Sequence, residues 1–188
     1  MLVLMRKYAA WRIVEFFLRN PSASVYVKEL AASLSMSSYT TSRVLAQLRE
    51  EGILDCETCA RAKFYSLADN PTVRALKRLR IIADIEQAGL VKNILSVDED
   101  AISIALYGSY ATGEYDEKSD MDIVCLSDVR EEEFADCVRK LERALGLELS
   151  LRVLPVRLWK EMARKDPVFY DNVVRSMVLL HGTSLVVR

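Results

Sequence analysis

The chain has 188 residues, 51% of them hydrophobic and 28% charged, with a formal net charge of −1 at pH 7. This length and composition allow one large or two small folded domains and exclude an intrinsically disordered chain. No stretch reaches about 18 consecutive apolar residues, and charged residues interrupt the apolar N-terminal segment, so we expect neither a membrane span nor a signal peptide, and a cytoplasmic protein.

The charge is distributed unevenly along the chain. Residues 1–95 carry 14 Lys and Arg against 9 Asp and Glu, a net charge of +5. Residues 96–188 carry 12 against 18, a net charge of −6. A basic half suits a polyanionic partner, and an acidic half suits a metal-dependent site.

The basic half begins with a helical pattern. Apolar residues recur at every third or fourth position over residues 3–19 and 28–34, which predicts two helices. Ser37 or Ser38 is a suitable N-cap for a third helix that runs to about residue 51. The second and third helices, joined by a tight turn, are typical of a helix-turn-helix.

Two short strands, 53–56 and 62–67, are expected next, around a turn that contains Arg61. Residues 8–68 therefore resemble a winged helix-turn-helix of the MarR or ArsR kind, which implies binding to double-stranded DNA. The residues expected to contact DNA are Ser38, Tyr39, Thr40, Ser42 and Arg43 at the start of the third helix, and Arg61 and Lys63 in the wing. The alternative is a winged helix that makes only protein contacts.

A long helix is predicted after the wing. Asn70 is an N-cap followed by a proline at the first helical position, and apolar residues recur from there to about residue 95. We expect this helix to connect two domains or to form the surface of a homodimer.

The acidic half contains the stretch with the strongest functional signal. A buried strand over residues 101–106 ends at Gly108 and Ser109, and Asp120 and Asp122 flank the start of the next apolar run. Residues two apart in a strand point to one face, so both carboxylates face the same side. Two convergent carboxylates suit Mg²⁺, while Gly108 lets the backbone approach a phosphate and the Ser109 hydroxyl can donate to it.

Gly108-Ser109, the ten-residue spacer containing Gly113, and Asp120-x-Asp122 resemble the signature of the DNA polymerase beta nucleotidyltransferase superfamily, in its minimal, MNT-type branch. The resemblance covers about residues 98–182. It implies that Asp120 and Asp122 bind two Mg²⁺ ions, and that Gly108 and Ser109 hold the triphosphate of an NTP such as ATP. The implied chemistry is in-line attack on the α-phosphate with release of pyrophosphate.

The third strand of the acidic half departs from the family pattern. Residues 147–154 alternate apolar and polar, as expected for a strand, and active relatives place a third carboxylate there. Alignment on Pro155 puts Arg152 at that position, with Ser150 and Glu148 on the same face. The site therefore either uses Glu148 as its third acid or binds a nucleotide without turning it over.

Helices are expected around this strand. The first covers about residues 128–145 and carries Glu131, Glu132 and Glu133 in its first turn, where they complement the helix dipole. A second covers about residues 155–164, and Asp166-Pro167 opens a last helix that we expect to end at Gly182.

The sequence thus predicts an α+β protein: a winged helix-turn-helix over residues 1–69, a linker helix over 70–97, and a nucleotidyltransferase domain over 98–188 with a small mixed sheet flanked by helices. We expect a Mg²⁺-dependent transfer of NMP from an NTP to a protein, RNA or small-molecule acceptor. Relatives of this type include antitoxins that modify a HEPN partner, so a HEPN-type protein or RNA acceptor fits better than a small molecule. The alternatives are a DNA-binding regulator with a degenerate, nucleotide-sensing domain, and a scaffold with neither activity.

Overall fold

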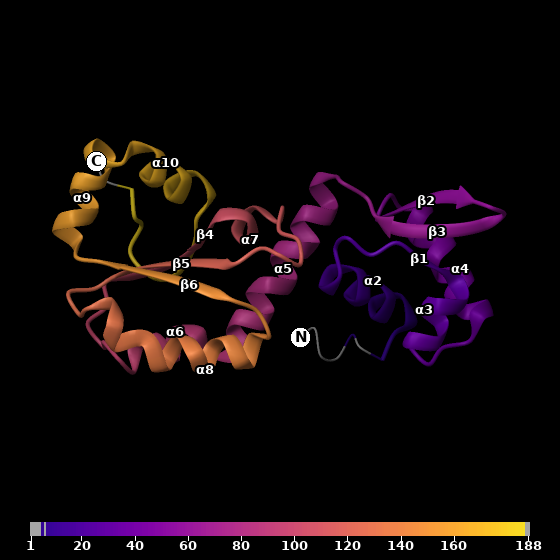
Figure 1. Cartoon of the computed structure of the whole chain (residues 1–188), viewed down its shortest axis with the longest axis horizontal. Helices are drawn as coiled ribbons and strands as arrows, with labels where there is room; N and C mark the ends of the chain where they lie inside the picture. The colour runs from indigo at the N-terminus through magenta and orange to yellow at the C-terminus, as the bar shows by residue number, and fades with distance from the viewer. Residues whose placement is uncertain (1–4, 6, 187–188) are drawn as a thin grey trace. The chain divides into compact units, whose positions relative to one another are not determined.

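The computed structural model describes residue 5 and residues 7–186 (Figure 1). These residues form two compact units. The first unit runs up to Arg80 and also contains Tyr115–Glu117, whereas the second contains Ile81–Glu114 and the residues from Lys118 onward. Helices and small sheets occur together in the chain, which confirms the expected mixed α+β class. Within the described residues, no helix is long and apolar enough to cross a membrane.

The first unit contains the three helices α2 (Ala9–Arg19), α3 (Val27–Ser33) and α4 (Ser38–Glu50). Their apolar faces meet in one core, because Phe17, Leu30 and Leu45 are fully buried together. Of the two predicted caps, Ser37 is the one that caps α4, by accepting a hydrogen bond from Thr40 N at 3.0 Å. The predicted start of α2 at residue 3 lies outside the described residues.

A three-stranded antiparallel sheet completes the first unit. Its strands β1 (Val25–Tyr26), β3 (Ala62–Leu67) and β2 (Leu54–Cys59) lie in that order. The hairpin between β2 and β3 turns at Ala60 and Arg61, whose φ angles are 47° and 71°. Two successive left-handed residues match the twist of a two-residue hairpin, although glycine or asparagine is the usual choice there.

The predicted long helix is divided in two. Helix α5 (Pro71–Ala88) ends at Gly89, which adopts φ +65°, and α6 (Leu90–Leu95) begins after it. The α5 positions next to the core include the charged Lys77 and Arg80, both buried, whereas Leu79 is 42% exposed. The apolar repeat alone therefore does not identify the inward face of this helix.

The second unit is built on a four-stranded mixed sheet in the order β6-β5-β4-β7. Strands β4 (Ser103–Tyr107) and β5 (Met121–Leu126) are antiparallel, and β6 (Leu149–Leu154) is parallel to β5. Strand β7 (Val178–Gly182) pairs antiparallel with β4. The prediction of a helix up to Gly182 is wrong, because the apolar run after residue 177 occupies the open edge of β4 instead.

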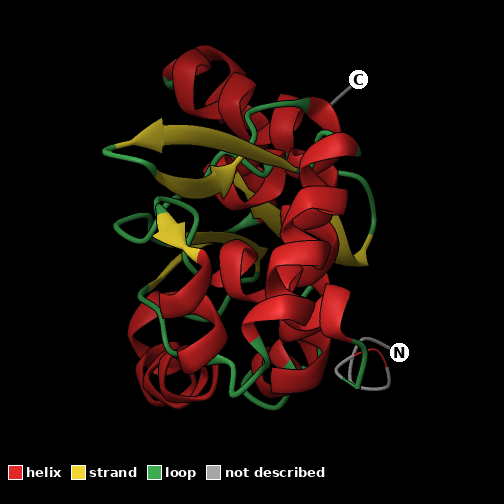
Figure 2. Ribbon diagram, turned by 90° about the vertical axis from the view of Figure 1, so that its right-hand side faces the viewer, coloured by secondary structure: helices red, strands yellow, loops and turns green. Residues whose placement is uncertain are grey.

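Helices cover both faces of this sheet, with α6 and α8 (Ala135–Leu145) on one face and α9 (Val156–Lys165) and α10 (Pro167–Ser176) on the other (Figures 1 and 2). Trp159 of α9 and Val173 of α10 pack against Ala105 and Val124 in the sheet. Two short helices complete the unit: α7 (Gly108–Thr112), between β4 and β5, and the 3₁₀ turn η1 (Glu131–Phe134), before α8.

Candidate active site

The turn from β4 into α7 brings a glycine against a carboxylate. Gly108 adopts φ +70°, in the left-handed region that favours glycine. A Cβ built on Gly108 would lie 2.5 Å from Asp122 Oδ2, closer than any real Cβ approaches such an atom. The structure therefore brings the predicted phosphate turn close to one predicted metal ligand, and any larger residue at position 108 would force the Asp122 side chain to shift.

Asp120 and Asp122 lie at the start of β5. Asp122 pairs with Tyr107 across the antiparallel ladder and is half-buried, whereas Asp120 precedes the strand and is exposed. Burial raises the pKa of the Asp122 carboxyl above its ordinary value, and the nearby charge of Asp120 raises it further. Two carboxylates that repel each other in this way favour a bound divalent cation, which neutralises both.

Ser176 holds the glycine turn from another element. Gly108 N donates to Ser176 Oγ at 3.0 Å, and Ser176 Oγ donates to Asn172 O at 2.6 Å in α10. The Gly108 amide is therefore already engaged. The Ser109 hydroxyl makes no hydrogen bond within the described part of the chain, so it can donate to a ligand. Sequence reasoning missed Ser176, which lies 68 positions from Gly108 and carries no local signal.

Tyr107 adds an aromatic side chain next to the carboxylates. It is 6% exposed, and its ring packs edge to face against Phe169 with 5.8 Å between ring centroids. Burial raises the pKa of the Tyr107 phenol, and Asp122 raises it further, while Arg152 acts in the opposite direction. The phenol therefore stays protonated and remains a hydrogen-bond donor near Asp122.

Strand β6 supplies the residues beside the carboxylates. The parallel register pairs Asp122 with Ser150 and Val124 with Arg152, and both β6 side chains are exposed. Ser150, and not Arg152, is therefore the direct neighbour of Asp122. Glu148 precedes the strand, is exposed, and contributes its carbonyl oxygen to Met121 N at 2.9 Å. Across the described residues, no group of three or more His, Cys, Asp or Glu side chains is placed to hold a metal.

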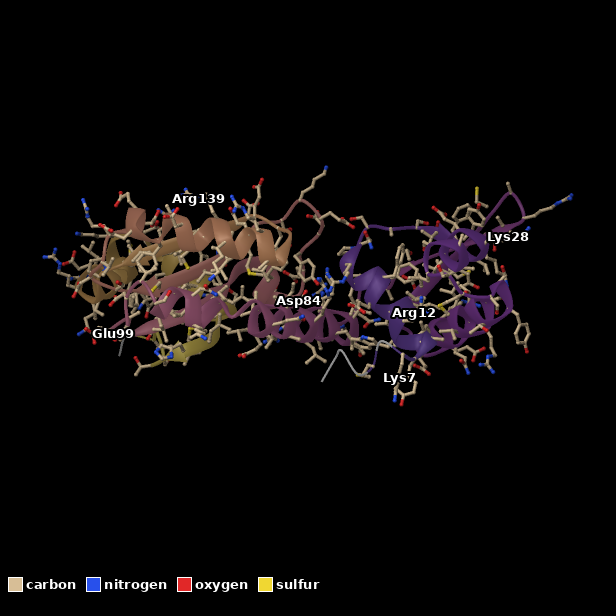
Figure 3. All side chains as sticks on the ribbon, turned by 90° about the horizontal axis from the view of Figure 1, so that it is seen from below. Lys7, Arg12, Lys28, Asp84, Glu99 and Arg139 are labelled. Atoms are coloured by element: carbon tan, nitrogen blue, oxygen red, sulfur yellow. The ribbon has the colours of Figure 1, made fainter. Side chains whose placement is uncertain are left out.

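The residues expected to contact DNA lie on two elements of the first unit. Tyr39 is 78% exposed, and most of the others are exposed as well. They are Ser38, Tyr39, Thr40, Ser42 and Arg43 on α4, and Arg61 and Lys63 on the β2–β3 hairpin. Thr40 is half-buried, because its hydroxyl and amide take part in the helix cap. Lys28 on α3, labelled in Figure 3, is a further exposed cation that the sequence reasoning did not include.

Residues 88–180 match the family model described as a nucleotidyltransferase domain. A stretch of 64 residues is 41% identical to a putative protein adenylyltransferase of Methanocaldococcus jannaschii. That match covers 32% of this chain and 64% of the relative, so the chain spans less than two-thirds of the relative's length.

Two solved structures resemble the chain more distantly. One is a toxin–antitoxin complex named MntA-HpeT, with a TM-score of 0.36 and 22% identity, covering 52% of this chain and 72% of that one. The other is a toxin–antitoxin crystallised with AMP-PNP, with a TM-score of 0.35 and 24% identity, covering 49% of this chain and 73% of that one. Because both TM-scores are low, neither structure supports an inference about the site of this chain.

Proposed function

We propose that the nucleotidyltransferase domain transfers a nucleoside monophosphate from an NTP to an acceptor hydroxyl in a Mg²⁺-dependent reaction. The observation that carries this proposal is the close approach of the Gly108 backbone to the Asp122 carboxylate. This close approach supports a phosphate-binding turn beside a metal-binding carboxylate, and nucleotidyl transfer needs both at one point.

Each side chain has a role in this reaction. Asp120 and Asp122 hold the divalent cation, which supplies positive charge to the triphosphate when it is bound. The Ser109 hydroxyl donates to a phosphate oxygen, and Ser176 keeps the Gly108 turn in place through the amide that it binds. Tyr107 lies beside Asp122, is almost fully buried and remains a neutral donor.

The acceptor is a protein or an RNA in this proposal. Support comes from the 41% identity to a relative whose name is putative protein adenylyltransferase. The Ser150 and Arg152 side chains of β6 are exposed, which leaves the acceptor side of the site open, as a macromolecular substrate requires. A HEPN-type partner protein is the acceptor to test first, with ATP as the nucleotide donor.

We further propose that the first unit is a winged helix that binds double-stranded DNA. Helix α4 offers small hydroxyl side chains and Arg43 in its exposed first turns, which are suited to phosphates and base edges. The hairpin carries Arg61 at its tip and Lys63 nearby, both exposed. Holding Arg61 in a left-handed conformation costs roughly 1 kcal/mol, which is consistent with a functional tip.

The residues of strand β6 favour a second candidate function. The direct neighbour of Asp122 is a serine, and an exposed arginine follows two residues later. Neither is a base at neutral pH, so activation of an acceptor hydroxyl lacks an evident protein group. In this alternative the domain binds a nucleotide without turnover, and the winged helix regulates transcription in response.

One experiment separates these functions. ATP, GTP, CTP and UTP are titrated with Mg²⁺ into the wild-type chain and an Asp120→Ala/Asp122→Ala variant by calorimetry. Pyrophosphate release is then measured with cell extract as the acceptor source. Binding lost in the variant together with pyrophosphate release supports the transferase. Binding without release supports the sensor, and the absence of wild-type binding rejects both.

A further inference from the structure

Three residues of the loop between α7 and Asp120 belong to the first unit. Gly108–Thr112 and the strand β5 lie in the second unit, yet Tyr115–Glu117 packs among residues of the first. We call Tyr115–Glu117 the anchor. The loop that separates the predicted phosphate turn from the predicted metal ligands therefore contains three residues that belong to the first unit.

Glu117 makes a paired contact with the turn between α2 and β1. Its Oε1 accepts from Ser22 N at 2.8 Å, and its Oε2 accepts from Ser22 Oγ at 2.6 Å. Partial burial acts to raise the pKa of Glu117, but the hydrogen bonds from Ser22 outweigh it and the pKa lies below the ordinary value. The carboxylate is thus ionised, and both of its oxygens are used by a single serine.

Tyr115 fixes the other end of the anchor. It is 3% exposed, and its hydroxyl donates to Leu18 O at 3.3 Å. Lys77 of α5 donates to the Tyr115 carbonyl oxygen, and its ammonium lies 4.3 Å from the centroid of the Tyr115 ring. The backbone and the ring of one residue are thus held by the same cation.

The buried Lys77 side chain stabilises the docked position of Tyr115. The side chain is 8% exposed, and burial lowers the pKa of its ammonium, while the nearby carboxylates of Asp116 and Glu117 act in the opposite direction. Release of the anchor would leave a buried ammonium without the carbonyl oxygen that accepts from it. Since an unpartnered buried charge is strongly disfavoured, the anchor stays docked.

Only short segments of chain join the anchor to α7 on one side and to Asp120 on the other. Two residues lead from Gly113, the C-cap of α7, to Tyr115, and three lead from Glu117 to Asp120. A fully extended residue spans at most about 3.6 Å, so Asp120 is tied to within roughly 11 Å of Glu117. We therefore expect displacement of the anchor to be passed on to α7, to Asp120 or to both.

We propose that Ser22 and Glu117 are positioning residues for metal binding at Asp120 and Asp122, acting through the anchored loop. This proposal rests on the proposed function only for the identity of the ligand. It makes the metal affinity of the nucleotidyltransferase unit depend on a turn of the first unit, which is the unit that we propose binds DNA.

The test uses the full chain and Mn²⁺ as the probe. Ser22→Ala removes one hydrogen bond, and Glu117→Gln removes the charge. We expect each to weaken Mn²⁺ binding by about tenfold, the usual effect of losing a group that supports a metal ligand. Because both act through one contact, the double variant should lose little more than the larger single loss.

Two matched controls separate positioning from general damage. Ser24→Ala changes an exposed serine of the same turn, and Glu99→Gln changes an exposed glutamate of the second unit that is labelled in Figure 3. Both should leave the Mn²⁺ affinity unchanged. Equal affinities in Glu117→Gln and Glu99→Gln would overturn the proposal.

Hydrogen exchange provides a readout that needs no ligand. The Gly113 and Met121 amides donate to Ser109 O and Glu148 O at either end of the anchored loop. Both should exchange at least about threefold faster in Glu117→Gln at an unchanged melting temperature. If the wild-type chain binds no Mn²⁺, the proposed function fails. The positioning role of the anchor is then tested by hydrogen exchange alone, and unchanged exchange rates of the two amides in Glu117→Gln would overturn it.

Discussion

A Cβ on Gly108 would lie 2.5 Å from Asp122 Oδ2, so a side chain at position 108 and the Asp122 carboxylate in its present position exclude each other. The first prediction follows from this contact. In Gly108→Ala, the added methyl group displaces the Asp122 carboxylate, so Mn²⁺ or Mg²⁺-NTP affinity should fall by at least about tenfold in calorimetry. The positive φ should also reduce the free energy of unfolding by about 1 kcal/mol.

Gly146→Ala is the matched control for that variant. Gly146 has φ +71°, almost the value of Gly108, but a Cβ there meets nothing within 4 Å. It should show the same loss of stability with wild-type affinity. Equal losses of affinity in the two variants would show that backbone strain, rather than the carboxylate contact, is responsible.

The second prediction concerns the pH dependence of Asp122. Its pKa is raised in the folded chain by burial and by Asp120. The folded state therefore binds a proton more tightly than the unfolded state, and this contribution to stability is lost as pH rises through the raised pKa. Metal affinity should change in the opposite direction, increasing over the same pH window as the proton leaves.

Asp122→Asn tests this directly in metal-free protein. It should raise the melting temperature by about 2 °C at neutral pH, by removing a half-buried charge that Asp120 repels, and it should abolish metal binding. Asp100→Asn, at an exposed carboxylate, should change neither quantity. A lower melting temperature in Asp122→Asn would contradict the electrostatic account.

The third prediction concerns Ser176. Ser176→Ala removes the acceptor of the Gly108 amide, so the turn loosens and NTP affinity should fall by about three- to tenfold, at a cost in stability of about 1 kcal/mol. Ser96→Ala is a suitable control, because Ser96 Oγ also donates to a carbonyl in its own helix but supports no turn. If both variants bind NTP like the wild type, Ser176 has no part in the site.

The fourth prediction uses the register of β6. Ser150→Asp places a carboxylate directly beside Asp122, so it should raise Mn²⁺ affinity by about tenfold and increase pyrophosphate release. Arg152→Asp adds the same group two residues along the strand, beside Val124, and should have the smaller effect. A larger gain from Arg152→Asp would mean that the alignment on Pro155, not the observed register, identifies the position of the third acid.

The fifth prediction concerns the first unit. Arg61→Ala and Lys63→Ala should each weaken binding to duplex DNA and reduce the slope of log affinity against log salt by about one. Lys160→Ala, at an exposed lysine of α9, should leave both quantities unchanged. Fluorescence anisotropy over a range of salt concentrations measures the slope. Identical slopes in the three variants would reject the hairpin as a DNA contact.

The sequence predicted those structural elements that depend only on residues close together in the chain. The cap at Ser37, the strands β4 and β5 and the turn at Gly108 are of this kind, because capping, strand burial and left-handed glycine depend on the nearest residues. The period of a strand predicts that Asp120 and Asp122 share one face; in the structure Asp122 lies in β5 and Asp120 directly precedes it.

Long-range contacts account for what the sequence did not show. The residues of β7 were assigned to a helix because only the exposed edge of β4, more than 70 positions earlier, selects a strand. Glu131 was expected to complement a helix dipole, yet its Oε2 accepts from Val153 N at 3.1 Å on the outer edge of β6. Ser22, Ser176 and Lys77 likewise act on residues between 38 and 95 positions away.

The central claim is that this site moves a nucleoside monophosphate, and transfer of radiolabel tests it most directly. The chain is incubated with cell extract, Mg²⁺ and NTP labelled at either the α- or the γ-phosphate, and label in acid-insoluble material is counted. The account predicts that α-label is incorporated, that γ-label is not, and that Asp120→Ala/Asp122→Ala abolishes incorporation. Equal α-label incorporation by the wild type and the double variant, or none by either, would contradict it.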